Sequence, residues 1–322
     1  MRVTVTSTER EPICAHLPLP LFAAVMGISG LGLVWHAVEE AWSLPALVSG
    51  GATALAAVVF VVLLALYACK WVRYPARVMN ELKHPVRINF LPAVSINLIL
   101  LGLLSEPWIG PWASWLWQAG AALQLVLTVI IVNVWFEAER PTSSINPAWF
   151  IPAVGNVLVP LAAMPAGHEL VAWFFMSIGL FFWIILGTMV FYRLVTKPPL
   201  EPAMQPTLVV MLAPPSVAFL AWINISGELN GLGYFFYFIA LLTFLVLLPQ
   251  VARFARLPFF PSWWAYTFPL AAFTVASFRF VELCGLAPGL IHIALAAIAS
   301  LVIVLVAVRT LLAVFRGELA QH

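Results

Sequence analysis

Long apolar stretches alternate with short polar or Pro- and Gly-containing breaks along the whole chain. A helix that crosses a bilayer needs roughly 20 mostly apolar residues. Ten stretches meet this description and are predicted to be transmembrane helices, at residues 18–37, 46–69, 88–105, 112–136, 147–164, 170–192, 205–225, 232–250, 261–281 and 289–312. The third and fifth are the least regular, because proline interrupts them. The pattern therefore predicts an all-α integral membrane protein.

Prolines divide these stretches into two alternating kinds. The odd-numbered stretches contain proline, at Pro20, Pro92, Pro152, Pro214, Pro215 and Pro269, whereas the even-numbered stretches have none in their interior. A proline bends a helix and frees a backbone carbonyl, which lipid cannot satisfy. Although membrane helices tolerate proline generally, strict alternation predicts kinked helices inside and straight helices outside. The expected fold is five helical hairpins in a pseudo-five-fold ring around a central pore.

Composition excludes the soluble and disordered classes. Of 322 residues, 63% are hydrophobic and 9% are charged, whereas soluble domains carry about 25% charged residues. The net charge of +2 gives no sign of a nucleic-acid partner. Cys14, Cys69 and Cys284 are scattered, which indicates neither a metal site nor a disulfide framework. No P-loop, HExxH or GxSxG motif supports an enzyme.

Basic residues indicate the orientation in the membrane. With ten helices, 14 of the 15 Lys and Arg residues fall on one side. They are Arg2, Arg10, Lys70, Arg73, Arg77, Lys83, Arg87, Arg140, Arg193, Lys197, Arg253, Arg256, Arg309 and Arg316, and only Arg279 falls on the other side. Since cytoplasmic loops carry the excess of basic residues, both termini are predicted to be cytoplasmic, in a bacterial inner membrane. The expected organisation is a tail at 1–16, without the apolar core of a signal peptide, a membrane domain at 17–312 and a tail at 313–322.

Lys83, His84 and Arg87 place positive charge at the predicted cytoplasmic mouth of the third stretch. They are candidates for an electrostatic funnel that concentrates anions, although topology determination alone requires such residues too. His36 and His292, near helix ends, could ligate haem or relay protons, but such residues are also common at the membrane interface.

Phenylalanines on the odd stretches are candidates for the pore lining. Phe268 directly precedes Pro269, so its ring could project into the lumen and close it; the alternative is ordinary packing between helices. The further candidates are Phe22, Phe90, Phe150 and Phe219. Around these rings we expect a mostly apolar lumen, with a weak positive potential from kinked backbone, Thr and Asn groups.

Several of these segments resemble one known family. The matching motifs are His84-Pro85-Val86-Arg87 with Asn89-Phe90, Ala213-Pro214-Pro215-Ser216 with Ala221-Trp222, and Trp263-Trp264-Ala265-Tyr266-Thr267-Phe268-Pro269, together with Leu17-Pro18 to Phe22 and Asn146-Pro147 to Asn156. They look like the tellurite-resistance/dicarboxylate transporter family, which includes the bacterial TehA and the plant guard-cell slow-type anion channels. The Trp263–Pro269 motif is the most specific and is closer to the plant channels.

The resemblance implies a homotrimer of ten-helix protomers, each with its own pore plugged by the phenylalanine at position 268. It implies passive permeation of small monovalent anions such as chloride or nitrate across a lipid bilayer, with neither a cofactor nor a metal. The alternative is a secondary transporter or efflux protein for dicarboxylate, sulfite or tellurite oxyanions. A membrane haem or quinone protein is a remote alternative. The phosphorylation-regulated tails of the plant channels are not expected here.

Overall fold

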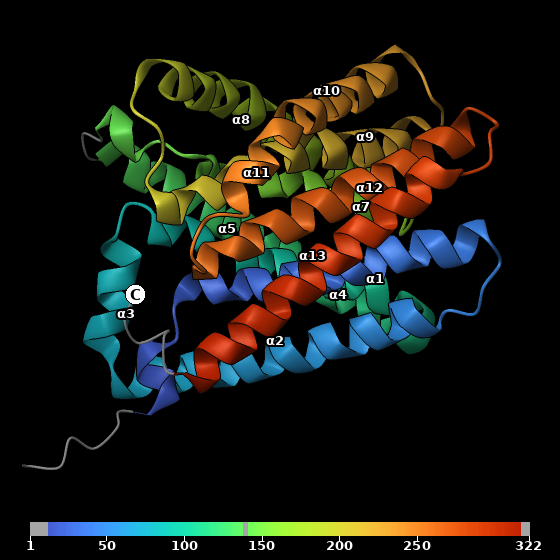
Figure 1. The fold of residues 1–322 in the computed structure, drawn as a ribbon. Helices are drawn as coiled ribbons and strands as arrows, with labels where there is room; N and C mark the ends of the chain where they lie inside the picture. Colours follow the sequence, from blue (N-terminus) through green and yellow to red (C-terminus); the bar gives the residue numbers. More distant parts are fainter. Residues whose placement is uncertain (1–11, 138–140, 317–322) are drawn as a thin grey trace, which may run out of the picture.

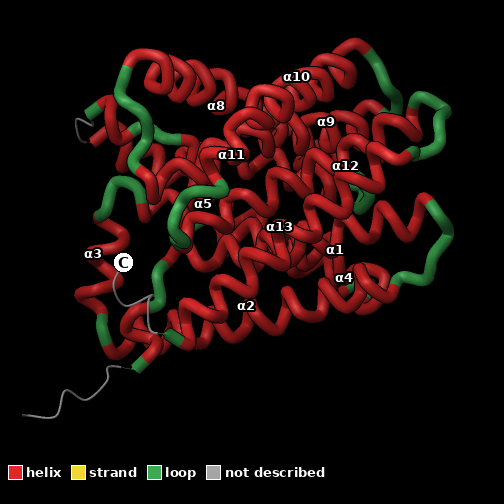
Figure 2. Tube along the Cα trace, viewed as in Figure 1, coloured by secondary structure: helices red, strands yellow, loops and turns green. Residues whose placement is uncertain are grey.

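The computed structural model describes residues 12–137 and 141–316, and these contain helices and loops but no strand (Figures 1 and 2). The α-helices are α1 (Ala23–Ala41), α2 (Leu47–Arg73), α3 (Pro75–Lys83), α4 (Ala93–Ile109), α5 (Trp112–Glu137), α6 (Phe150–Val154), α7 (Val159–Ala163), α8 (Glu169–Thr196), α9 (Ala213–Ser226), α10 (Gly231–Leu247), α11 (Val251–Phe254), α12 (Thr267–Leu283) and α13 (Leu290–Phe315). The 3₁₀ helices are η1 (Ile13–His16), η2 (Leu19–Phe22), η3 (Arg87–Phe90), η4 (Thr142–Ser144), η5 (Pro147–Trp149), η6 (Gly155–Leu158), η7 (Pro202–Leu212), η8 (Leu248–Gln250) and η9 (Pro261–Tyr266).

Helical structure occurs at all ten predicted stretches. Within the described residues, eight helical segments are long and apolar enough to cross a membrane. The fifth stretch is a shorter apolar segment, Pro147–Ala163, which is broken into η5, α6, η6 and α7. The ninth stretch forms η9 and α12 and is not among the eight. The all-helical membrane fold is confirmed, and the crossing of all ten segments stays a prediction.

Burial separates inner from outer segments as the proline alternation predicts. In the first, third and seventh stretches, 56% to 72% of the most apolar window is buried, whereas the five even stretches bury 22% to 33%. Apolar side chains on the even helices are therefore exposed in the isolated chain, where lipid would cover them.

The inner segments contact one another in a closed order. Helix α1 packs against α4 and α12, and α12 packs against α9, while α7 and η6 connect α9 to α4. Each inner segment also packs against the outer helix that follows it, in the pairs α1–α2, α4–α5, α7–α8, α9–α10 and α12–α13. This is the neighbour order that a ring of five hairpins requires. Its pseudo-five-fold symmetry stays a prediction.

The prolines mark changes of helix type, which differs from the expected kinks within continuous helices. Pro20 lies in η2, Pro92 directly precedes α4, and Pro214 with Pro215 and Pro269 lie in the first turns of α9 and α12. In each of these segments a 3₁₀ helix leads into an α-helix. Proline is tolerated in a first turn because its missing N–H would be unpaired there anyway. Pro152, inside the five-residue α6, is the exception.

Side chains of an outer helix satisfy the carbonyl at the broken fifth stretch. The carbonyl oxygen of Pro152 accepts hydrogen bonds from Gln124 Nε2 at 2.9 Å and Thr128 Oγ1 at 2.7 Å, both on α5. Asn156 Nδ2 donates to Ala153 O at 2.7 Å. The polar groups at this break therefore lie between inner and outer helices. Protein groups of α5 therefore cover the carbonyl at this break. The weak positive potential expected in the lumen stays a prediction.

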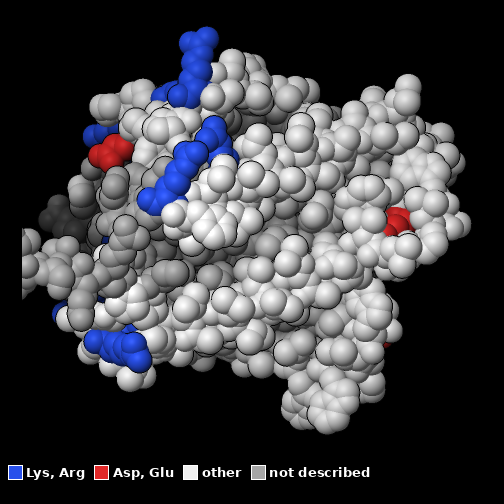
Figure 3. All heavy atoms as spheres, turned by 60° about the horizontal axis from the view of Figure 1, so that its bottom comes forward, with Lys and Arg blue, Asp and Glu red and all other residues white. Residues whose placement is uncertain are grey.

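Basic residues gather at one end of the molecule. In Figure 3, Lys and Arg side chains lie over the end that carries α3 in Figure 1. The helix η1 and the end of α13 lie at this same end (Figure 1). Three basic residues of the predicted cytoplasmic side, Arg2, Arg10 and Arg140, lie outside the described residues, as does most of the tails predicted at 1–16 and 313–322. Residues 13–16 of the first tail form η1, which contacts α2.

Candidate functional site

A cavity of about 70 Å³ lies between the inner segments. All five contribute to its lining, for example through Ala23, Phe90, Phe150, Pro214 and Phe268. A water molecule needs roughly 10–15 Å³ of such space, so the cavity is large enough for a few water molecules. A cavity shared by five segments that are far apart in the sequence is the strongest candidate for a functional site.

The lining of this cavity is apolar. Its residues are Ala, Gly, Val, Leu, Ile, Met, Pro, Phe and Trp. Of these side chains only that of Trp264 has a polar atom, and its Nε1 donates to Thr310 Oγ1 of α13 at 2.9 Å. The cavity therefore offers an ion neither a fixed charge nor a free side-chain hydrogen bond, and entry requires the loss of hydration water.

Phe268 lies on the cavity wall at the start of α12 and is 5% exposed. Its backbone packs closely against α1, because a Cβ placed on Gly30 would stand 3.7 Å from Phe268 Cα and 2.8 Å from Ala271 Cβ. Gly27 makes a similar close approach to Thr267. Two glycines on α1 thus allow the helix that carries Phe268 to lie directly against it.

Phe90 and Phe150 also line the cavity and are 5% and 3% exposed. Phe90 is the last residue of η3 and Phe150 is the first residue of α6. Like Phe268, each ring therefore belongs to the point where its inner segment changes from 3₁₀ to α-helix. Three of the five predicted phenylalanines are brought together at one cavity.

The other two predicted pore-lining phenylalanines pack away from the cavity, and for them the expected position differs from the observed one. The ring of Phe22 contacts Phe60 and Tyr67 of α2, with centroid separations of 6.4 and 5.7 Å. The ring of Phe219 lies 5.5 Å from that of Tyr237 on α10. A place on an inner helix does not decide whether a side chain reaches the cavity. These two rings pack against outer helices, and the ring of Phe219 also lies 6.1 Å from that of Phe280 on α12.

The predicted basic mouth lies on the surface between α3 and η3. Lys83, His84 and Arg87 are exposed, and none of them lines the cavity. His84 Nδ1 accepts hydrogen bonds from the backbone N–H of Val86 at 3.2 Å and of Arg87 at 3.3 Å. Partial burial and the nearby Arg87 lower the pKa of His84 below its usual value. The positive charge at neutral pH therefore comes from Lys83 and Arg87, and His84 adds to it only in acid.

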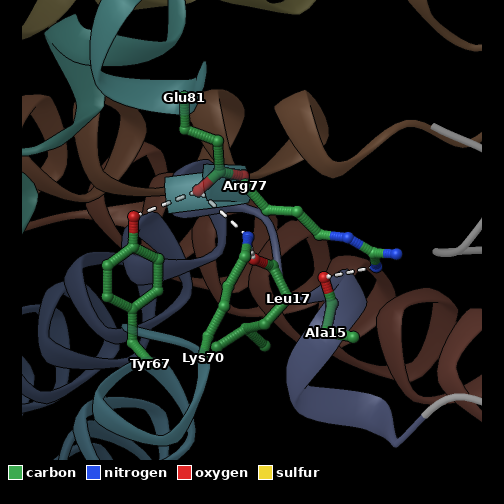
Figure 4. Close-up of polar contacts among 6 residues, drawn as sticks. All are labelled: Ala15, Leu17, Tyr67, Lys70, Arg77 and Glu81. Atoms are coloured by element: carbon green, nitrogen blue, oxygen red, sulfur yellow. Dashed lines mark hydrogen bonds and ion pairs between the residues drawn. The ribbon is translucent and has the colours of Figure 1, made fainter. Parts of the chain in front are cut away.

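A buried ion pair near the N-terminal segment was missed from the sequence (Figure 4). Lys70 Nζ lies 3.1 Å from Glu81 Oε2, and the two side chains are 3% and 7% exposed. Lys70 Nζ also donates to Leu17 O at 2.7 Å, and Tyr67 Oη donates to Glu81 Oε2 at 3.0 Å. Sequence reasoning treated Lys70 as a topology residue, since its partner lies in the next helix and only the fold shows that both are buried.

The two candidate haem or proton-relay histidines have separate surroundings. His36 is exposed on α1. His292 Nδ1 accepts a hydrogen bond from the backbone N–H of Gly289 at 3.1 Å, and its ring lies 5.3 Å from that of Phe278. Within the described residues, His, Cys, Asp and Glu form no group of three or more that could hold a metal ion.

Comparison with known proteins matches residues 16–311 to the family model described as voltage-dependent anion channel. The S-type anion channel SLAH3 of Arabidopsis thaliana is 26% identical over 322 residues, which cover 97% of this chain and 51% of the relative. An uncharacterized transporter, MJ0762, of Methanocaldococcus jannaschii is 29% identical over 255 residues, which cover 70% of this chain and 73% of the relative. A tellurite resistance protein TehA homolog of Haemophilus influenzae is 26% identical over 259 residues, which cover 80% of this chain and 79% of the relative.

The family match includes every inner segment and every residue named at the cavity. The chain spans about half the length of the plant relative, but most of the two microbial relatives. The resemblance of the motifs is thereby confirmed, and the chain belongs to the voltage-dependent anion channel family.

Proposed function

We propose that this protein is a membrane channel for small monovalent anions, such as chloride and nitrate, and that Phe268 closes its pore. One observation carries the proposal: residues from all five inner segments, Phe268 among them, line one apolar cavity in a chain of this family. The names of the plant relatives, which are S-type anion channels, support anions as the permeating species.

The apolar lining supports a channel for weakly hydrated ions over a carrier for divalent ones. An ion in this cavity exchanges water for apolar side chains, and the cost of losing hydration rises steeply with charge. A dicarboxylate or another divalent oxyanion would need a compensating cation, and the residues that line the cavity include no Lys, Arg or His. Monovalent anions with weakly held water fit this lining better.

The remaining features of the proposal rest on the family and on the charge distribution. Lys83 and Arg87 attract anions toward the cytoplasmic end. Both chain ends face the cytoplasm of a bacterial inner membrane, ten helical segments cross the bilayer, and three copies assemble with one pore each. The protein performs transport without an enzymatic reaction, a cofactor or a nucleic-acid partner.

Anion-substitution electrophysiology of the purified protein in planar bilayers tests the proposal. We expect a current whose reversal potential shifts with the chloride or nitrate gradient and does not change with the cation gradient. Bilayers without protein are the control. Electroneutral, saturable exchange of malate or sulfite without such a current would replace the channel by the transporter alternative. An absorption spectrum of the same preparation with haem bands would instead favour the haem protein.

A further inference from the structure

Two cysteines that are 55 positions apart in the sequence meet at the end of the molecule that carries α3. Cys69 Sγ, in the last turns of α2, donates a hydrogen bond to Cys14 Sγ of η1, and the two sulfur atoms are 3.3 Å apart. Cys14 is buried, Cys69 is partly exposed, and Cys284 is exposed at the end of α12. Since a disulfide bond is about 2.0 Å long, the sulfur atoms of Cys14 and Cys69 would have to approach by only about 1.3 Å.

Other contacts hold the two cysteine-bearing segments together independently of the thiols (Figure 4). Lys70, the residue after Cys69, donates from Nζ to Leu17 O at 2.7 Å. Arg77 Nη1 donates to Ala15 O, the carbonyl of the residue after Cys14, at 3.4 Å. Lys70 is itself fixed by its ion pair with Glu81. The residues that directly follow Cys14 are thus held against α2 and α3 by contacts that do not involve the thiols.

We propose that Cys14 and Cys69 form a reversible redox site, which a small-molecule disulfide such as glutathione disulfide converts from two thiols to one disulfide bond. The thiolate of Cys69 attacks one sulfur of glutathione disulfide, whose S–S bond breaks and releases one glutathione thiolate. Cys14 Sγ then loses its proton and attacks Cys69 Sγ, which releases the second glutathione. Two protein thiols are oxidised, and their two electrons and two protons pass to two molecules of glutathione.

The order of these steps follows from accessibility. Cys69 is partly exposed and can meet the oxidant, whereas Cys14 is buried. The contact with the neighbouring Cys69 thiol and burial raise the pKa of Cys14, which disfavours its thiolate. Cys14 therefore serves as the resolving thiol, which reacts within the protein after Cys69 has been attacked.

The disulfide would fix the segment that leads into the inner helix α1. From Cys14 the chain passes through η2 to Ala23 and Met26, which line the cavity. In the topology proposed above this end faces the cytoplasm, where disulfides are transient or redox-sensing and seldom structural. A reversible covalent link between η1 and α2 is the form expected in that compartment.

Mass spectrometry of the full-length protein tests this site without measuring transport. The purified protein is reduced, freed of reductant, treated with excess glutathione disulfide and quenched with N-ethylmaleimide. We expect the loss of two hydrogens without added glutathione on Cys14 or Cys69, a linked peptide pair that contains both residues, and recovery of both thiols with dithiothreitol. Cys284→Ser should give the same linked pair, whereas Cys14→Ser should retain glutathione on Cys69.

The wild-type peptide map alone decides the outcome, so the test does not depend on the folding of a variant. If Cys69 keeps glutathione and Cys14 is alkylated in wild-type protein, or if both are simply alkylated, the site is overturned. Cross-links that involve only Cys284 would overturn it as well.

Discussion

Gly30 of α1 lies directly against Phe268 of α12. A Cβ placed on Gly30 would stand 3.7 Å from both Cα and Cδ2 of Phe268, and 2.8 Å from the Cβ of Ala271. The glycine therefore sets how closely the helix that carries the proposed gate approaches its neighbour. The position of Phe268 on the cavity wall depends on this helix contact as well as on its own side chain.

Phe268→Ala is expected to raise anion current per protein severalfold. The ring lies on the wall of an apolar cavity, so its removal widens the path for an ion, while Pro269 and the start of α12 remain in place. Single-channel recording together with quantified protein in the membrane measures this. A well-expressed variant with unchanged conductance would remove Phe268 from the role of gate.

Phe273→Ala is the matched control for this prediction. Phe273 is on the same helix and 2% exposed, but its ring stacks on Phe244 of α10 at 4.7 Å and does not line the cavity. Loss of such a buried ring costs about 3–5 kcal/mol through cavity formation. We expect less folded protein and no rise in conductance per channel.

Gly30→Ala is expected to lower thermal stability. The new methyl group meets Ala271 Cβ at 2.8 Å, and overpacking of this kind costs about 1–3 kcal/mol. Gly51→Ala, on the exposed face of α2, places its methyl group in open space and should leave the melting temperature unchanged or slightly raised. Melting curves in one detergent compare the two. Equal melting temperatures for both variants would contradict the close approach of α1 and α12.

Sequence periodicity could predict the membrane class and the inner and outer helices, because both depend on residue type alone. A run of apolar side chains fits only lipid or a core, and proline disfavours a continuous helix except in its first turn. Which side of an inner helix faces the cavity, however, depends on how the helices pack against one another. Phe22 and Phe150 both sit at the start of inner α-helices, yet Phe150 lines the cavity and Phe22 contacts α2.

Polar contacts between helices could not be predicted from hydrophobic periodicity and proline positions. Gln124 and Thr128 are four positions apart in an apolar stretch, which puts both on one helix face and is a signal that could have been used. Their acceptor, the carbonyl of Pro152, is known only from the fold. The contact between Cys14 and Cys69 is equally invisible, since it depends on how η1 lies on α2.

His84 should make stability depend on pH on the acid side. Its pKa lies below the unperturbed value of 6.5 in the folded protein. As the pH falls through 6.5, the unfolded chain binds a proton before the folded chain does, so the free energy of unfolding decreases. Above that pH both states are neutral and the effect is absent.

His84→Asn tests this dependence, because Asn offers an oxygen acceptor to the N–H of Val86 and cannot be protonated. We expect wild-type protein to lose more thermal stability than His84→Asn as the pH is lowered from neutral, and the two to melt alike above neutral pH. Parallel melting temperatures throughout the acid range would show that His84 does not titrate with folding.

The double substitution Lys83→Gln with Arg87→Gln, which removes both positive charges, should lower the anion current most at low ionic strength. Both residues lie on the surface outside the cavity, so they act through their field, which salt screens over about 10 Å at 0.1 M. Lys197→Gln, at the end of the outer helix α8, is the control and should have a smaller effect. Current that falls equally at every salt concentration would indicate loss of folded or correctly inserted protein instead.

Removal of one partner from the buried Lys70–Glu81 pair should destabilise the protein far more than removal of a partner from an exposed pair. Lys70→Met leaves the carboxylate of Glu81 buried without its cation, at a cost of about 3–5 kcal/mol, and also removes the donor to Leu17 O. The control is the exposed ion pair between Arg279 and Glu282. Arg279 Nη1 lies 2.7 Å from Glu282 Oε2, and the two side chains are 42% and 61% exposed. Arg279→Gln should therefore reduce the free energy of unfolding by at most about 1 kcal/mol. The double variant Lys70→Met with Glu81→Leu should recover part of the loss, because no charge remains buried. Unfolding in one detergent measures all of them, and a Lys70→Met variant as stable as Arg279→Gln would show that this pair is not desolvated.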